Sequence, residues 1–130
     1  MIVVDTSALV AILLREPEAS AFSTIIELSG NCLLSAVSRV EFSMVVEGRS
    51  GGAGRAMLER TLDEAAIEIV AITPAHAEIA IDAFRRFGRG RHKAALNMGD
   101  CFSYALAKAL DVPLLFKGDD FSQTDIPVAV

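Results

Sequence analysis

Short runs of apolar residues alternate along the chain with longer amphipathic stretches. Residues 2–4 are β-branched or apolar, too few for a helix, and are followed by Asp5, Thr6 and Ser7, which are residue types that cap helix N-termini. This pattern predicts a buried strand leading into a helix. The same pattern predicts strands at 32–34, 67–72 and 113–116, with a short edge piece at 126–128.

The stretches between these runs have the spacing of helices. We expect helices at 8–15, at 17–29 with Pro17 in the first turn, and at 35–47 with Ser35 as the cap. Further helices are expected up to 66, at 74–87 and at 99–110. Residues 48–54 hold four of the nine glycines and predict a flexible loop between two helices. They lack the Gly-Lys-Ser/Thr ending of a phosphate-binding loop.

Strands that alternate with helices, without a tight hairpin signal, indicate an α/β fold with a mostly parallel sheet. A length of 130 residues fits one domain, 1–130. A hydrophobic fraction of 52% and a mean hydropathy of +0.44 exclude a disordered chain. No basic leader and no apolar run of about 18 residues is present, so we expect a cytoplasmic protein without a membrane segment.

The charge and the cysteines narrow the function further. Seventeen acidic against twelve basic residues give a net charge of −5, which argues against a protein that coats nucleic acid by bulk positive charge, but not against a local basic strip. Cys32 and Cys101 each lie in an apolar run, so we expect two reduced core thiols.

Acidic residues recur where the predicted strands end. In parallel sheets ligands bind beyond the carboxyl ends of the strands. Asp5 ends the first strand, Asp119 and Asp120 follow the last, Glu41 lies about two turns into the helix after the second, and Asp100 lies in a first helical turn. A site made only of carboxylates suits Mg²⁺ or Mn²⁺ rather than zinc, and such ions support phosphodiester hydrolysis.

Each acid also has a structural explanation. Asp5 could serve only as an N-cap, and Glu41 could be solvated. Asp100 is favoured in a first turn by the helix dipole, and the pair after Gly118 could be turn residues. The residues alone leave both explanations open.

Several blocks resemble the PIN-domain ribonucleases, and most closely the VapC toxins of bacterial toxin–antitoxin pairs. They are Asp-Thr-Ser-Ala at 5–8, Glu41, the block Asn-Met-Gly-Asp-Cys-Phe-Ser-Tyr-Ala-Leu-Ala-Lys at 97–108, and the tail at 113–126. The resemblance runs through the whole chain in order. It implies a PIN-like three-layer α/β/α sandwich whose central, mostly parallel sheet has four to five short strands.

The resemblance also implies a metal-dependent endoribonuclease toxin, neutralised by a cognate antitoxin and usually dimeric. Asp5 and Asp100 match the metal-binding acids, and Glu41 matches the third acid. Phe116 and Gly118 replace a Thr and an Asp of the family's last block, so Asp120 is favoured as the fourth acid and Asp119 is its substitute. Thr6 and Ser7 are expected to orient Asp5 or to bind a water ligand.

A basic segment covers the end of the helix predicted at 74–87 and the residues that follow it. Five of the twelve basic residues lie within nine positions, and they suggest a strip for RNA phosphates: Arg85, Arg86, Arg89, Arg91 and Lys93. A solvated helix end is the structural alternative. Apolar positions of the first two helices that remain exposed would form an antitoxin groove or a dimer patch.

Other functional classes fit less well. A phosphoaspartate receiver needs an acid pair after its first strand, but Thr6 follows Asp5. A dehalogenase-type phosphatase needs Asp-x-Asp there, and Ser7 occupies the second position. A deoxyribonuclease and a catalytically weak PIN-like domain that binds RNA or a protein without cleavage remain as alternatives.

Overall fold

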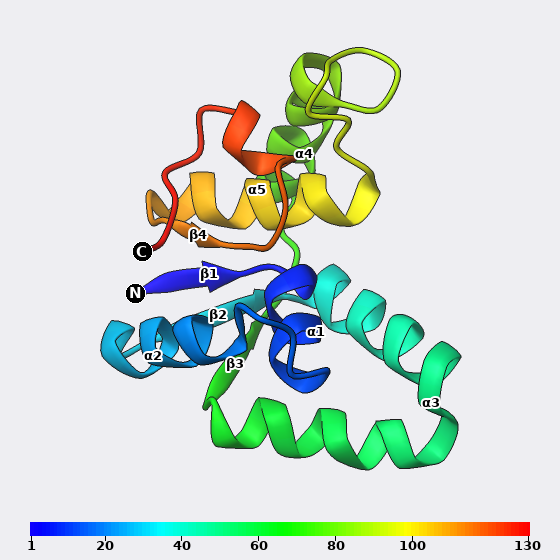
Figure 1. Cartoon of the computed structure of the whole chain (residues 1–130). Coiled ribbons are helices and arrows are strands. Elements are labelled where there is room, and N and C mark those ends of the chain that lie inside the picture. The colour runs from blue at the N-terminus through cyan, green and yellow to red at the C-terminus, as the bar shows by residue number, and fades with distance from the viewer.

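A single parallel sheet organises the chain. The computed structural model describes all 130 residues, and its strands lie in the order β3-β2-β1-β4 (Figure 1). The strands are β1 (Ile2–Val4), β2 (Cys32–Ser35), β3 (Ile67–Val70) and β4 (Leu114–Leu115). Each neighbouring pair is parallel. Four short apolar runs therefore pair as the sequence predicts.

Helices cover both faces of the sheet. On one face lie α1 (Thr6–Leu13), α2 (Ala19–Ser29) and α3 (Ala36–Glu64), and on the other lie α4 (Pro74–Phe87) and α5 (Met98–Leu110) (Figure 1). The short 3₁₀ helix η1 (Phe121–Gln123) packs with the second group. Alternate strand residues enter the two cores, Val4 on the first face and Val3 on the second. This is the expected three-layer α/β/α sandwich.

Helix starts follow the capping residues. The Ser35 hydroxyl accepts a hydrogen bond from the Val37 amide at 3.3 Å and caps α3, as predicted. Pro74 opens α4 behind the cap Thr73. The predicted start of the first helix at residue 8 is late, because Asp5 caps α1 and the helix begins at Thr6. The second helix begins at Ala19, two residues after Pro17.

The glycine-rich segment is not a loop, contrary to the sequence prediction. α3 continues through it, and only Gly51, with φ +59° and ψ −141°, leaves the helical conformation. The helix folds back there into two arms (Figure 1). Ion pairs Arg39–Glu59 and Arg55–Glu47, each 2.6 Å long, join the arms. One glycine is enough for the reversal because it alone tolerates this backbone conformation.

Two predicted strands are shorter than expected. β3 ends at Val70, which pairs with Ser35, because β2 ends there and offers no partner for residues 71–72. β4 has two residues, and Gly118 turns the chain soon afterwards with φ +103°. The piece at 126–128 contributes only an isolated bridge between Val128 and Leu114. Its Pro127 has no amide hydrogen to extend a ladder.

Two further sequence expectations concern composition. Cys32 and Cys101 are both buried and free, as predicted. No helix combines the length and the apolar character needed to cross a membrane.

Candidate active site

Three acids from distant segments meet at the carboxyl edge of the sheet. Asp5 lies between β1 and α1 and is only 3% exposed. Glu41 lies on the first arm of α3, and Asp100 in the first turn of α5. The charges of Asp5 and Glu41 both act on Asp100, so the three carboxylates lie within electrostatic reach of one another. The topology brings them together as the sequence predicts.

Both carboxylate oxygens of Asp5 accept hydrogen bonds. Oδ2 accepts from the Ser7 amide at 3.0 Å and from the Ser7 hydroxyl at 2.7 Å. Oδ1 accepts from the Ser103 hydroxyl at 2.6 Å. The amide of Lys117, just after β4, donates to the Ser7 hydroxyl at 3.0 Å. Asp5 is therefore the cap of α1 and also a carboxylate held from two sides.

Glu41 is positioned by a glycine. A β-carbon added to Gly99 would lie 2.7 Å from the carboxyl carbon of Glu41, so the Glu41 carboxylate occupies the space that a side chain on α5 would take. Burial raises the pKa of Glu41, a hydrogen bond with Thr6 lowers it, and the charge of Asp5 raises it again. Gly99 thus allows α3 to present Glu41 beside Asp100.

Asp100 combines a structural contact with an unusual pKa. Its Oδ2 accepts from the Asn97 amide at 3.0 Å, and its amide donates to the Asn97 side chain at 2.9 Å, which is a capping box. The pKa of Asp100 is raised to about 7, mainly by burial. The charges of Asp5, Asp120 and Glu41 raise it further, whereas the backbone hydrogen bond at Asn97 lowers it. Loss of hydration on burial is the main cause, and repulsion by the neighbouring carboxylates adds to it.

The two acids after β4 are both exposed. Asp120 precedes η1, and its charge is one of those that raise the pKa of Asp100, whereas Asp119 is not. The main-chain oxygen of Asp119 accepts bonds from Ser122 and Gln123. Asp120 is electrostatically part of the cluster.

No cation neutralises this acid cluster, defined as Asp5, Glu41, Asp100 and Asp120. None of the four forms an ion pair, and the nearby Lys117 binds Glu16 and Glu18 at 3.3 Å instead. No three acidic, histidine or cysteine side chains lie close enough, as they stand, to hold one ion. The donor chemistry nevertheless fits a hard divalent ion, because carboxylates that raise one another's pKa are the groups such an ion stabilises.

Hydroxyl groups line the cluster. Ser7 contacts Asp5, as predicted. The Thr6 hydroxyl does not: it donates to the main-chain oxygen of Ser38 at 3.1 Å and lowers the pKa of Glu41. Sequence reasoning missed Ser103 and Ser38, whose hydroxyls lie 3.0 Å apart. Ser103 lies three residues after Asp100 and Ser38 three before Glu41, which puts each on the face of its helix that carries an acid.

Some side chains of the basic segment have partners within the protein and others do not. Arg86 pairs with Asp82 at 3.6 Å and with Asp125 at 3.5 Å, and its guanidinium lies over the ring of Phe87. Arg91 lies over Phe84. The remaining three basic residues are exposed and form no ion pair: Arg85, Arg89 and Lys93. The loop that carries two of them leads directly into the first turn of α5, which holds Asp100.

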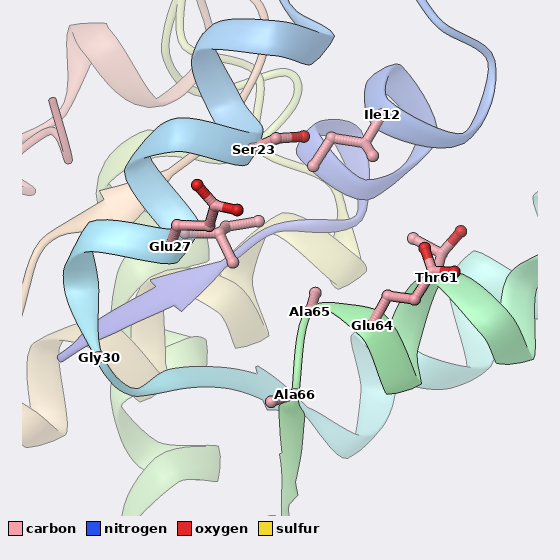
Figure 2. A pocket seen from close by; sticks show the side chains of 9 residues that line it. Ile12, Ser23, Glu27, Gly30, Thr61, Glu64, Ala65 and Ala66 are labelled. Carbon is pink, nitrogen blue, oxygen red and sulfur yellow. The ribbon is translucent and has the colours of Figure 1, made fainter.

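Two pockets of about 400 Å³ each lie outside the acid cluster. Figure 2 shows the first, which is lined by Glu27 of α2, Glu64 of α3 and Ala66, the residue before β3. This pocket therefore lies toward the amino ends of the strands, away from the acids. The second is an apolar groove between α4 and α5, with these lining residues: Ala77, Ala80, Ile81, Phe84, Met98, Cys101 and Phe102.

Comparisons with known proteins agree with this architecture. The PIN domain model matches residues 2–127. Ribonuclease VapC30 of Mycobacterium tuberculosis is 48% identical over 124 residues, 95% of each chain. The crystal structure of VapC20 from the same species, a toxin that cleaves the sarcin–ricin loop, aligns with a TM-score of 0.78 at 16% identity over 100% of this chain and 98% of that one. A toxin–antitoxin complex from Klebsiella pneumoniae aligns with a TM-score of 0.67 at 18% identity, covering 96% and 93%.

Proposed function

The chain belongs to the PIN-domain family, and from that membership we propose that it is a divalent-metal-dependent endoribonuclease acting as the toxin of a toxin–antitoxin pair. Relatives that match 95% of the chain are ribonucleases of the VapC type. The observation that carries the proposal is the acid cluster, in which distant segments bring carboxylates together without a cation. Such an arrangement is unfavourable unless something positive binds there.

Mg²⁺ or Mn²⁺ is the proposed cofactor, held by Asp5 and Asp100 with Glu41 and Asp120 completing the site; Asp119 is the substitute for Asp120. When bound, the ion supplies activation of water and charge stabilisation at the scissile phosphate. Ser7 and Ser103 hold the Asp5 carboxylate, and Gly99 leaves room for Glu41. Thr6 orients Glu41.

RNA is the proposed substrate. Because the net charge of the protein is −5, local basic residues are needed to bind this polyanion. Arg85, Arg89 and Lys93 would bind its phosphates, since they are exposed and free of ion pairs, with Arg91 beside them on Phe84. Arg86 contributes less, because two aspartates already hold it. The place of action would be the cytoplasm, where cellular RNA is found.

Two protein partners are proposed. The first is a cognate antitoxin, supported by the likeness to a toxin–antitoxin complex. The second is another copy of the chain, seated on the apolar groove between α4 and α5, where Met98 is 72% and Phe84 42% exposed. Light scattering should give a dimer mass for the wild type and a monomer mass for Phe84→Glu.

The ribonuclease function is tested by removing the acids one at a time. Asp5→Asn or Asp100→Asn should abolish metal-dependent RNA cleavage with the circular dichroism spectrum unchanged. Asp63→Asn, on the far arm of α3 and without an ion pair, is the matched control and should cleave like the wild type. Wild-type rates in the Asp5 or Asp100 variants would contradict the assigned site. Mn²⁺ binding without cleavage would favour the catalytically weak alternative, and cleavage of DNA alone would favour a deoxyribonuclease.

A further inference from the structure

A buried hydroxyl chain connects two helices to Asp5. Ser103 on α5 donates to Asp5 Oδ1 at 2.6 Å, although the two residues are 98 positions apart. Ser38 on α3 lies 3.0 Å from Ser103, oxygen to oxygen. Both serines are fully buried, with no exposed area, and Asp5 is nearly so. This chain of hydroxyls is therefore shielded from solvent.

The direction of the hydrogen bonds between these hydroxyls follows from which oxygens carry a proton. A carboxylate only accepts, so the single hydroxyl proton of Ser103 is used on Asp5. The bond between the two serines must then be donated by Ser38 to the oxygen of Ser103. Each donation polarises the next hydroxyl, so the bond that reaches Asp5 is strengthened by the one behind it. Ser38 thus acts on Asp5 through Ser103.

The acceptor sites on Asp5 show which oxygen is left for a ligand. Each carboxylate oxygen has about two lone-pair positions. On Oδ2, both are used by the amide and the hydroxyl of Ser7. On Oδ1, one is used by Ser103 and the other has no hydrogen-bond partner. The oxygen with a free position is therefore the one that Ser103 holds.

We propose that Ser103, supported by Ser38, is a positioning residue that aims Asp5 Oδ1 at the divalent ion of the acid cluster. The inference rests on the proposed metal-dependent function. Without the Ser103 hydroxyl, Oδ1 has no hydrogen-bond partner, and only the two bonds from Ser7 to Oδ2 restrain the tilt of the Asp5 carboxylate. The ion then loses a preorganised ligand, although all four acids remain in the chain.

The test is a titration with Mn²⁺ alone, followed by isothermal calorimetry, on the wild type, Ser103→Ala, Ser38→Ala and the double variant. Ser103→Ala should weaken Mn²⁺ binding by about 10- to 100-fold, the range known for residues that orient metal ligands. Ser38→Ala should weaken it less. In the double variant, Ser38→Ala should add almost nothing to the loss of Mn²⁺ affinity, because Ser38 acts on Asp5 only through the Ser103 hydroxyl.

Ser29→Ala is the matched control. The Ser29 hydroxyl is partly buried and contacts Ile26 and Cys32 at the other edge of the sheet, so its loss can lower stability but should leave Mn²⁺ affinity unchanged. Thermal unfolding of each variant confirms that it is folded at the temperature of the titration.

Wild-type Mn²⁺ affinity in a folded Ser103→Ala variant would overturn the proposal, as would full additivity of the two serine substitutions. Failure of the wild type to bind Mn²⁺ would overturn it too. RNA cleavage is measured in parallel: a wild type that binds Mn²⁺ but does not cleave contradicts the ribonuclease function, while the titrations still decide the role of Ser103.

Discussion

A single missing side chain shapes the acid cluster at Gly99. The Glu41 carboxylate occupies the space of the absent β-carbon, so Gly99→Ala should push Glu41 away from Asp100. Because a carboxylate at the end of a flexible chain can move, the fold should survive, and the melting temperature should not fall. Cleavage should drop roughly 10- to 100-fold. Gly48→Ala, a helical glycine with open space around it, is the control and should leave the cleavage rate unchanged.

A second residue, Asp125, ties the C-terminal segment to α4 and α5. It accepts from the Tyr104 hydroxyl at 2.6 Å and from Lys108 at 2.9 Å, and it pairs with Arg86. Burial raises the pKa of Asp125, but the bonds from Tyr104 and Lys108 and the charges of Lys108 and Arg86 outweigh it and lower the pKa to about 2. The ionised form is thus favoured by folding.

The free energy of unfolding should therefore depend on pH between the ordinary and the lowered pKa of Asp125. With a lowered pKa, the contribution of Asp125 is complete above its ordinary value of 3.8 and is lost as the pH falls toward 2. Asp125→Asn should lower the free energy of unfolding at neutral pH by on the order of 1 kcal/mol and flatten its dependence on pH in that window. Urea unfolding across the window measures both, and an equally steep dependence in Asp125→Asn would refute the assignment. Asp63→Asn should keep the wild-type slope.

Among the elements, α3 is the one whose shape depends on the backbone conformation of a single residue, Gly51. Gly51 has φ +59° and ψ −141°, where a β-carbon is strained, so Gly51→Ala should destabilise the protein by about 1–3 kcal/mol. Gly52→Ala is the neighbouring control, in a helical conformation with open space, and should be neutral or stabilising by up to about 1 kcal/mol. Urea midpoints decide this, and equal effects of the two substitutions would contradict a kink centred on Gly51.

The elements also show where sequence patterns stop being informative. Buried runs such as 2–4 and caps such as Ser35 were predictable, because burial and capping act on neighbouring residues. The glycine segment was not, since its composition fits both a loop and a helix with one reversal. The choice depends on contacts between residues far apart in the sequence: Val46 and Leu58, on different arms of α3, share one core, and Arg39 pairs with Glu59, 20 positions away. Similarly, β3 ends where its partner ends, which its own sequence does not encode.

At the scale of the whole molecule, the sheet topology allowed the grouping of the acids to be predicted, but not the side chains that contact them. Acids after parallel strands share one edge, so Asp5, Glu41 and Asp100 could be grouped from the sequence. The bond from Ser103 to Asp5 spans 98 residues and joins helix to strand end, and only the folded chain reveals it. The same holds for Arg86, whose partner Asp125 lies 39 residues away.

The distribution of charge, rather than its sum of −5, should govern RNA binding. Arg89→Gln and Arg60→Gln change the net charge equally, and both arginines are exposed without an ion pair. Arg89 follows α4 in the basic loop beside α5, whereas Arg60 lies on α3 across the sheet. Arg89→Gln should weaken RNA affinity and reduce the slope of log K against log salt by about 0.7, the value for one lost phosphate contact on a single strand. Arg60→Gln should change neither; equal effects in salt-dependent binding titrations would mean that bulk charge controls the encounter.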